Sequence, residues 1–338
     1  MTRIPPKKLL LILLVMLPLS LAVGLVVGPE IILPFVSGAE SQTFSNQLIV
    51  EQIRLPRTLM AAIIGATLAV SGVMMQGLFR NPLADPSLIG VSSGASAGAS
   101  FMIVMGAGLF GMHELLGVSF VALGAFIGAA LATWLVYRLA ATASGTSVAT
   151  MLLAGIAISA LAGALNSFFS FIADNHMLRQ ISLWQMGSLS SASWNRVALA
   201  FVLLGGLLCW FPRYSRALNA LLLGESEARH LGIDVDSVKV QIIILVALAV
   251  GVAVALTGTI AFVGLVTPHM VRLIIGPDHR GLIPCAALAG AILLVLADAC
   301  SRYVLAPGEL PIGVVTAVLG APFFLSLLRR QRNVVEGV

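Results

Sequence analysis

The feature that most constrains this chain is a succession of long apolar segments separated by short polar ones. The first runs from Leu9 to Val27, directly after Arg3, Lys7 and Lys8, and similar segments recur to the end of the chain. A helix needs about 20 apolar residues to cross the hydrocarbon core of a bilayer. Lipid offers the backbone no hydrogen-bond partner and strand-like alternation is missing, so we expect these segments to be membrane-spanning helices.

Ten such segments can be marked, and we predict an all-α, polytopic fold in which residues 1–338 form a single transmembrane domain. The first segment is too long for a signal-peptide core and lacks a small-residue cleavage site, so we expect it to remain as the first helix. Only 10% of the residues are charged, against about 25% in a soluble domain, which excludes a water-soluble globule. The predicted spans cover residues 9–33, 58–79, 91–109, 115–138, 148–172, 195–211, 240–257, 259–275, 282–300 and 311–328.

The distribution of positive charge predicts the orientation of these helices. With the N-terminus inside, 14 of the 19 Lys and Arg residues fall on the cytoplasmic side, as the positive-inside rule requires. Ten spans then place the C-terminus on the cytoplasmic side as well. The five remaining cations fall on the outer side: Arg54, Arg57, Arg179, Arg196 and Arg302.

The residues that usually carry chemistry are few and scattered, which excludes most catalytic classes. The only lysines are Lys7, Lys8 and Lys239, so the chain has no phosphate-binding loop, and its three cysteines lack a CxxC spacing. The five histidines fall on both sides of the membrane, so we expect no metal site, no bound cofactor and no enzymatic activity. Basic runs interleaved with aromatic residues are missing, so we expect no nucleic-acid partner.

Transport is the function class that fits this composition, and the energy source separates two alternatives. A secondary carrier would place ionisable residues at mid-depth in its helices, and Asp298, near the end of a span, is the one weak candidate. A transporter driven by a separate ATPase subunit needs no such residue in this chain.

An unusual polar segment lies between the second and third predicted spans. It reads RNPLADPSLIGVSSGA over residues 80–95, and by itself it fits an ordinary tight turn with an Asp–Arg pair equally well. Together with the preceding IRLPRTLMAAIIGATLAVSGVMMQGLF, it closely resembles the signature of the FecCD family of permeases. The likeness continues through ISLWQMGSL, GTIAFVGLVTPHMVRLIIGPDHR, LADACSR and GELPIGVVTAVLGAPFF. The signature positions are Arg80, Asn81, Pro82, Asp85, Pro86, Gly90 and Gly94.

The resemblance implies the permease subunit of an ABC importer in the inner (cytoplasmic) membrane. It implies a homodimer with one path at its interface, two ATP-binding cassette subunits inside that use the ATP, and a periplasmic substrate-binding protein outside. The family carries haem, iron-siderophores and cobalamin. Because residues 78–95 and 183–194 look most like haem permeases, haem is the first expectation, followed by ferric siderophores and then cobalamin.

The longest charged stretch, residues 213–239, falls on the predicted cytoplasmic side between the sixth and seventh spans. It reads as short helices broken at Gly224 and Gly232, and it keeps apolar residues that a solvated loop would not expose. The resemblance implies that it forms coupling helices that dock into the ATPase, although the Glu-Ala-Ala pattern of importers is matched imperfectly. The residues assigned to coupling are Leu221, Leu222, Leu223, Gly224, Glu225, Glu227, Ala228, Arg229 and Gly232.

Two further sets of residues receive roles from the resemblance. Arg54, Arg57 and Arg302 fall on the side that the positive-inside rule leaves poor in cations, and the matching arginines of the family pair with glutamates of the binding protein. Anchoring of these arginines at the membrane interface is the alternative. Thr146 and Ser147, between the fourth and fifth spans, match the position of the cytoplasmic gate.

Overall fold

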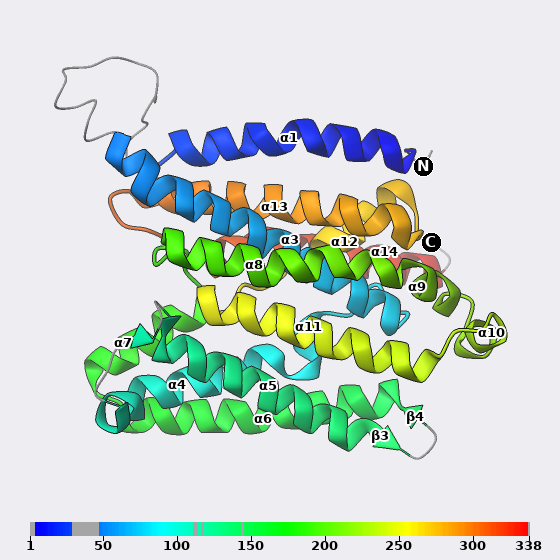
Figure 1. Ribbon diagram of the computed structural model, residues 1–338, viewed down its shortest axis with the longest axis horizontal. Helices are drawn as coiled ribbons and strands as arrows, with labels where there is room; N and C mark the ends of the chain where they lie inside the picture. Colours follow the sequence, from blue (N-terminus) through cyan, green and yellow to red (C-terminus); the bar gives the residue numbers. More distant parts are fainter. Residues whose placement is uncertain (1–3, 29–46, 111–113, 116–117, 143–144, 337–338) are drawn as a thin grey trace.

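The computed structural model of the chain is a bundle of long helices that run parallel or antiparallel to one another (Figure 1). It describes residues 4–28, 47–110, 114–115, 118–142 and 145–336, with side chains described over the same ranges except 107–110, 114–118, 142–146 and 327–336. Helix α3 lies at the centre and is buried along almost its whole length, with α8, α11, α12 and α13 packed around it.

Each of the ten predicted segments overlaps an apolar helix of the described residues. These helices are α1 (Pro6–Val26), α3 (Leu55–Leu78), α4 (Val91–Phe110), α5 (Phe120–Ala140), α6 (Val148–Ile172), α8 (Trp194–Trp210), α11 (Val235–Thr257), α12 (Val263–Ile275), α13 (His279–Val304) and α14 (Ile312–Glu336). Seven helical segments of the described chain are long and apolar enough to cross a membrane by length and composition, and the apolar parts of α4, α12 and α14 are shorter. The helical, multi-pass character predicted from the sequence is confirmed.

Short elements connect the long helices, and several of them were not predicted. Helix α7 carries polar and apolar residues on different faces and begins after Asp174, whose carboxylate accepts the N–H of Met177 at 2.8 Å. The first predicted span, 9–33, is shorter in the structure, because α1 ends at Val26 and residues 29–33 lie outside the described residues. The short elements are η1 (Ile49–Arg54), η2 (Pro86–Ile89), α7 (Asn175–Gln185), η3 (Phe211–Tyr214), α9 (Ser215–Leu221), α10 (Glu225–His230) and the two-residue antiparallel pairs β1 (Glu114–Leu115) with β2 (Val118–Ser119) and β3 (Ala141–Thr142) with β4 (Gly145–Thr146).

Glycines bring several helices into backbone contact, and two pairs illustrate this. A side chain at Gly65 of α3 would overlap the carbonyl group of Gly290 on α13, and a side chain at Gly98 of α4 would overlap the carbonyl group of Gly124 on α5. Small residues at helix interfaces allow this approach in lipid, where dispersion contacts replace the hydrophobic effect. The close packing predicted from the small residues around Gly124 and Gly290 is confirmed.

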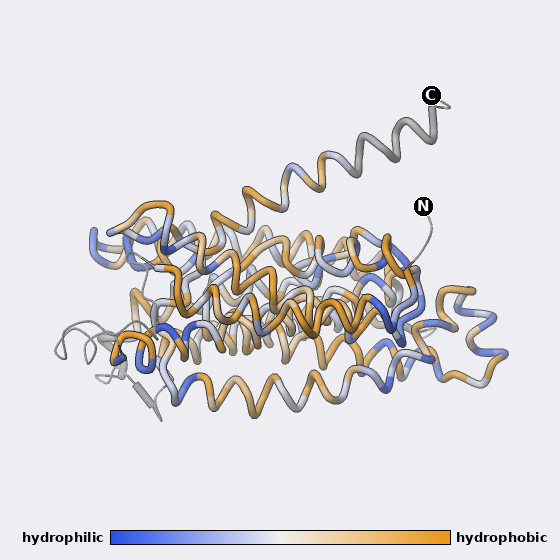
Figure 2. Tube along the Cα trace, turned by 90° about the horizontal axis from the view of Figure 1, so that it is seen from above, coloured by the Kyte–Doolittle hydropathy of each residue, from blue (hydrophilic) through white to orange (hydrophobic). Residues whose placement is uncertain are grey.

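The two ends of the bundle differ in what they carry. Helices α9 and α10 project at one end, where α1 begins, and this end is called the inner end after the predicted orientation (Figure 1). The opposite end carries η1 and α7 and is called the outer end. Figure 2 shows apolar residues along the length of the bundle and most of the hydrophilic residues towards its two ends, as expected for helices that cross a bilayer.

Candidate functional site

Four charged side chains meet at the outer end. Arg57 lies in the first turn of α3, and its Nε donates to Asp298 Oδ1 on α13 at 2.8 Å. Its Nη1 donates to both carboxylate oxygens of Glu309, at 3.0 and 2.9 Å. Arg302, one turn after Asp298, lies with its Nε 3.1 Å from the second carboxylate oxygen. We call Arg57, Asp298, Arg302 and Glu309 the outer ion cluster.

The outer arginines also hold the end of α1. Arg302 Nη2 donates to the carbonyl oxygen of Gly24 at 2.8 Å, and Arg54 Nη1 donates to those of Leu25 and Val26 at 2.9 and 2.7 Å. The last carbonyl groups of a helix lack intrahelical partners, and a cation is favourable beside them. All three arginines predicted to dock a partner are buried, with exposed fractions of no more than 6%. They do not project from the surface, and their docking role stays a prediction.

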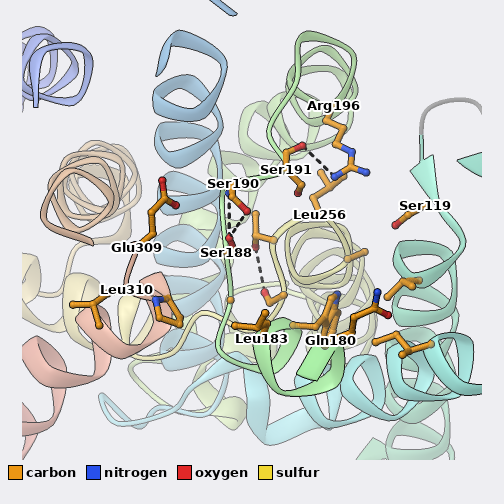
Figure 3. Close-up of a pocket in the computed structure, with 18 residues that line it drawn as sticks. Ser119, Gln180, Leu183, Ser188, Ser190, Ser191, Arg196, Leu256, Glu309 and Leu310 are labelled. Atoms are coloured by element: carbon orange, nitrogen blue, oxygen red, sulfur yellow. Dashed lines mark hydrogen bonds between the residues drawn. The ribbon is translucent and has the colours of Figure 1, made fainter. Parts of the chain in front are cut away.

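A cavity of about 670 Å³ opens at the outer end, near the cluster (Figure 3). Its walls come from α7 and the segment that follows it, from the start of α8, from the end of α11 and from residues 309–311, with further lining residues in α4 and at the start of α5. Apolar side chains include Leu183, Trp184 and Leu256. The polar residues of the lining are Ser119, Gln180, Thr257, Ser188, Ser190, Ser191, Arg196 and Glu309.

The predicted coupling segment is two short helices, α9 and α10, that reach beyond the inner end of the bundle (Figure 1). The predicted break at Gly224 is confirmed, because its φ of +125° is a conformation that only glycine adopts readily. Leu221 and Ala228 are buried, whereas Leu223 is 70% exposed and Leu231 is 64% exposed. The segment therefore presents apolar side chains outward, as the sequence predicted.

Ion pairs fix the coupling segment to the start of α11. Lys239 Nζ lies 2.7 Å from Glu225 Oε1, and Arg229 Nη2 lies 2.9 Å from Asp236 Oδ2. The first pair is largely buried on the lysine side, whereas both side chains of the second are more than 40% exposed. Two of the residues assigned to coupling, Glu225 and Arg229, thus position α10 on α11.

A polar contact joins α9 to the start of α13. Asn219 Nδ2 donates to Asp278 Oδ1 at 2.6 Å, and Asn219 Oδ1 accepts the backbone N–H of His279 at 2.9 Å. The same oxygen lies 2.8 Å from His279 Nδ1. The Arg280 backbone N–H and the Asn219 amide hold the pKa of the Asp278 carboxyl below its usual value. We call Asn219, Asp278 and His279 the inner junction.

The signature segment is a rigid turn that packs α4 into the bundle. Asp85 accepts the N–H of Ser87 at 2.8 Å and so begins η2, which ends at Gly90 with φ of +79°. Gly94 has no room for a side chain beside the backbone of α5. Within the described residues no ion pair joins Asp85 to Arg80, so the turn is held by capping and close packing.

The predicted gate residues lie where α5 turns back into α6. Thr146 pairs with Ala141 in the short β3–β4 ribbon, and its side chain lies outside the described part of the chain. Ser147 begins α6, with its Oγ accepting the N–H of Thr150 at 3.3 Å. Ser147 is therefore the N-cap of α6, and the gating role of both residues stays a prediction.

Several residues at both ends were missed by sequence reasoning. Asn219 and Glu309 bond to residues far away in the chain, so no local pattern marks them. Three serines of the cavity, Ser188, Ser190 and Ser191, lie in the segment 183–194 that the resemblance singled out, without a role attached. Among the described residues, no group of three or more His, Cys, Asp or Glu side chains is placed to hold a metal ion.

Comparison with known proteins agrees with this architecture. Residues 10–330 match the FecCD transport family. The chain belongs to this family. It is 44% identical over 285 residues to the hemin transport system permease protein HmuU of Yersinia pestis, a match that covers 84% of each chain. It is 43% identical over 289 residues to the cobalamin import system permease protein BtuC of Halobacterium salinarum, covering 84% of this chain and 74% of that one.

A solved structure shares the whole fold. It is a metal-chelate type ABC transporter in an inward-facing conformation, with a TM-score of 0.82 and 32% identity, and the match covers 96% of this chain and 99% of that one. The FecCD chain described here is thus an ABC importer permease and a multi-pass membrane protein. Membership of this family excludes the secondary carrier.

Proposed function

We propose that this FecCD permease imports haem as a homodimer in the inner (cytoplasmic) membrane. The single observation that carries the proposal is the identity of 44% with a hemin permease over most of both chains. A cobalamin permease at 43% makes cobalamin the second candidate, and a metal-chelate transporter of the same fold keeps ferric siderophores as the third. ATP is hydrolysed by two partner ATPase subunits and not by this chain.

The proposed topology has ten membrane-spanning helices with both termini in the cytoplasm. It is supported by the ten apolar helices and by the charge asymmetry, although three of the helices have apolar parts shorter than a full span. Two of these shorter helices, α4 and α12, are packed against the longer helices α5 and α13 rather than exposed singly to lipid.

The inner end is the proposed contact with the ATPase subunits. Exposed Leu222, Leu223 and Leu231 on and beside α9 and α10 supply the apolar surface that a partner would cover. A partner shifts the equilibrium between inward-open and outward-open states only by binding one of them better. The coupling segment therefore transmits such a preference to α11 through Lys239 and to α13 through Asn219.

At the outer end we propose that a periplasmic binding protein docks over the region of Arg54, Arg57 and Arg302. The burial of these arginines means that they act by shaping and charging this region rather than as protruding contacts. At the inner end, Thr146 and Ser147 are proposed to line the gate that closes the path towards the cytoplasm.

Uptake by the assembled transporter in vesicles tests the proposal. The permease, its ATPase and its binding protein are reconstituted, and ATP-dependent uptake of labelled haem, ferric siderophore and cobalamin is compared. We expect haem uptake to exceed the other two, and to vanish with an ATPase subunit that cannot hydrolyse ATP. Faster uptake of cobalamin or of a ferric siderophore would overturn the choice of haem.

A further inference from the structure

A groove runs along one face of α1, away from the cavity and from the coupling segment. Its volume is about 530 Å³. Two cations stand at one end of it and apolar side chains follow, in pairs four positions apart, which places them on the same face of the helix. The lining residues are Lys7, Lys8, Leu11, Ile12, Val15 and Met16. We call this surface the α1 groove.

The α1 groove faces away from the rest of the bundle. Helix α1 forms an edge of the bundle and packs mainly on α13 (Figure 1). Leu9 and Leu13 are buried on the packed side, whereas Leu11 is 66% exposed and Val15 is 56% exposed. An apolar face of this kind on a multi-pass membrane protein is a surface for lipid.

The two lysines at the inner end of the groove have no partner within the described residues. Lys7 and Lys8 lie in the first turn of α1, which contains no acidic residue. Both are exposed, and in the part of the chain that the structure describes neither side chain has an ion-pair or hydrogen-bond partner. Their positive charge is therefore available to an anion from outside the chain.

The start of α1 is fixed to the bundle, so the position of the lysines is fixed as well. The N–H of Ile4 donates to the carbonyl oxygen of Ile274 at 3.1 Å. Gly281 of α13 gives room to Pro6, because a side chain at Gly281 would overlap the proline ring. A backbone that is already held in place reduces the cost of ordering a binding site.

The groove has the length of one leaflet of a bilayer. From Lys7 to Met16 the helix rises about 14 Å, at about 1.5 Å per residue. One leaflet contributes about 15 Å, which is half of a hydrocarbon core of about 30 Å. The ammonium groups thus lie at the level of lipid headgroups when the apolar residues lie beside acyl chains, since lysine side chains extend towards the membrane surface.

We propose that the α1 groove binds one anionic phospholipid of the inner leaflet. Its headgroup lies at Lys7 and Lys8, and an acyl chain lies along the apolar residues of the groove. Two cations without a countercharge favour an anionic headgroup over a zwitterionic one, whose own positive charge offsets its phosphate. The leaflet follows from the predicted orientation of the chain, and the site does not depend on which cargo the transporter carries.

Native mass spectrometry of the full chain in detergent tests the proposal. The chain is titrated with phosphatidylglycerol or with phosphatidylcholine of the same acyl chains, and the affinity of the first bound lipid is measured. Phosphatidylglycerol should bind about tenfold or more tightly, because each lysine beside an anionic headgroup contributes about fivefold. The preference should shrink as salt rises. Equal affinities of the two lipids for the wild type would overturn the proposal.

Substitution of the lysines locates the site. Lys7→Gln with Lys8→Gln should lower the affinity for phosphatidylglycerol to that for phosphatidylcholine, and Lys7→Arg with Lys8→Arg should retain it. Arg213→Gln with Arg216→Gln is the matched control, because both arginines are exposed at the inner end and neither lines the groove. An equal loss in this control would show a general effect of positive charge and overturn the assignment to the groove.

Two further measurements test the identity of the occupant. Glycerol phosphate carries the anionic group without acyl chains, and at equal concentration it should not displace phosphatidylglycerol. Complete displacement would show a site for soluble phosphate and overturn the choice of a lipid. If the Lys7→Gln, Lys8→Gln variant binds phosphatidylglycerol like the wild type but no longer co-purifies with its ATPase subunits, the occupant is that partner and the proposal is overturned.

Discussion

The two ends of α13 are held in place by different chemistry. At the outer end, the Asp298 carboxylate lies between two guanidinium groups, and the side chains of Arg57, Asp298 and Arg302 are no more than 7% exposed. At the inner end, the uncharged amide of Asn219 bonds to Asp278 and to the backbone of His279 at the edge of the bundle. The outer contact is an ion pair buried from solvent, whereas the inner contact is an amide hydrogen bond close to solvent.

This difference predicts how each end of α13 responds when a partner binds. Removing one member of a buried ion pair leaves an uncompensated charge, so the outer ion cluster has a single stable arrangement. Water can replace a hydrogen bond near the surface at small cost, so the inner junction can open and close again. We therefore expect the outer end of α13 to stay fixed on α3, while its inner end adjusts as the coupling segment moves.

The largest effect is expected from Asp298→Ala. Two buried guanidinium groups would lose their shared countercharge, and such a change costs about 3–5 kcal/mol of the free energy of unfolding. Denaturant unfolding of the purified chain in detergent measures it. Asp236→Ala, which removes an exposed carboxylate, is the control. A loss of unfolding free energy below about 1 kcal/mol, which is usual for exposed ion pairs, would mean that water reaches the outer ion cluster. The contrast between the two ends of α13 would then be wrong.

Asn219→Ala should have an intermediate effect. The substitution removes the side-chain oxygen of α9 that accepts the N–H of His279 in the first turn of α13. The loss of such an acceptor at a helix start costs about 0.5–2 kcal/mol of the free energy of unfolding. Arg216→Ala is the control, because Arg216 is exposed on the same helix. In the reconstituted transporter, Asn219→Ala should lower the amount of cargo moved per ATP while hydrolysis continues. A stability loss as large as that of Asp298→Ala would show that the inner junction is as rigid as the outer cluster.

A pH titration of stability sharpens the description of the inner junction. Because the folded chain holds the pKa of Asp278 below its usual value, the carboxylate adds stability above about pH 4 that is lost as the pH falls through the folded pKa. Asp278→Asn should therefore destabilise the chain at pH 7 and flatten the acid side of the stability curve. Thermal unfolding of both proteins between pH 7 and pH 3 measures this, and parallel curves would contradict it.

The smallest effect is expected from Arg229→Ala. Its ion pair with Asp236 is exposed on both sides, and exposed pairs contribute about 0–1 kcal/mol. Denaturant unfolding at low and high salt should differ little between the variant and the wild type. A loss comparable to that of Asn219→Ala would show that α10 is held on α11 mainly by this pair.

Much of the architecture followed from local patterns in the sequence. Apolar length alone located ten helices, because a bilayer leaves no other structure for such segments. Gly224 and Gly232 marked the breaks of the coupling segment, since their φ values of +125° and +82° are accessible mainly to glycine. The small residues around Gly124 marked a close helix contact, because residues without bulky side chains let a neighbouring backbone approach.

The burial of the charged side chains and the choice of their ion-pair partners were decided only by the tertiary structure. Counting charges placed Arg57 on the outer side, but its burial depends on Asp298 and Glu309, which lie 241 and 252 residues further along the chain. The cavity likewise exists only because five segments that are far apart in the sequence meet at the outer end. The sequence by itself located the apolar helices, because hydropathy is a property of each segment. Which charged groups meet depends on how the helices pack, and no local pattern records that.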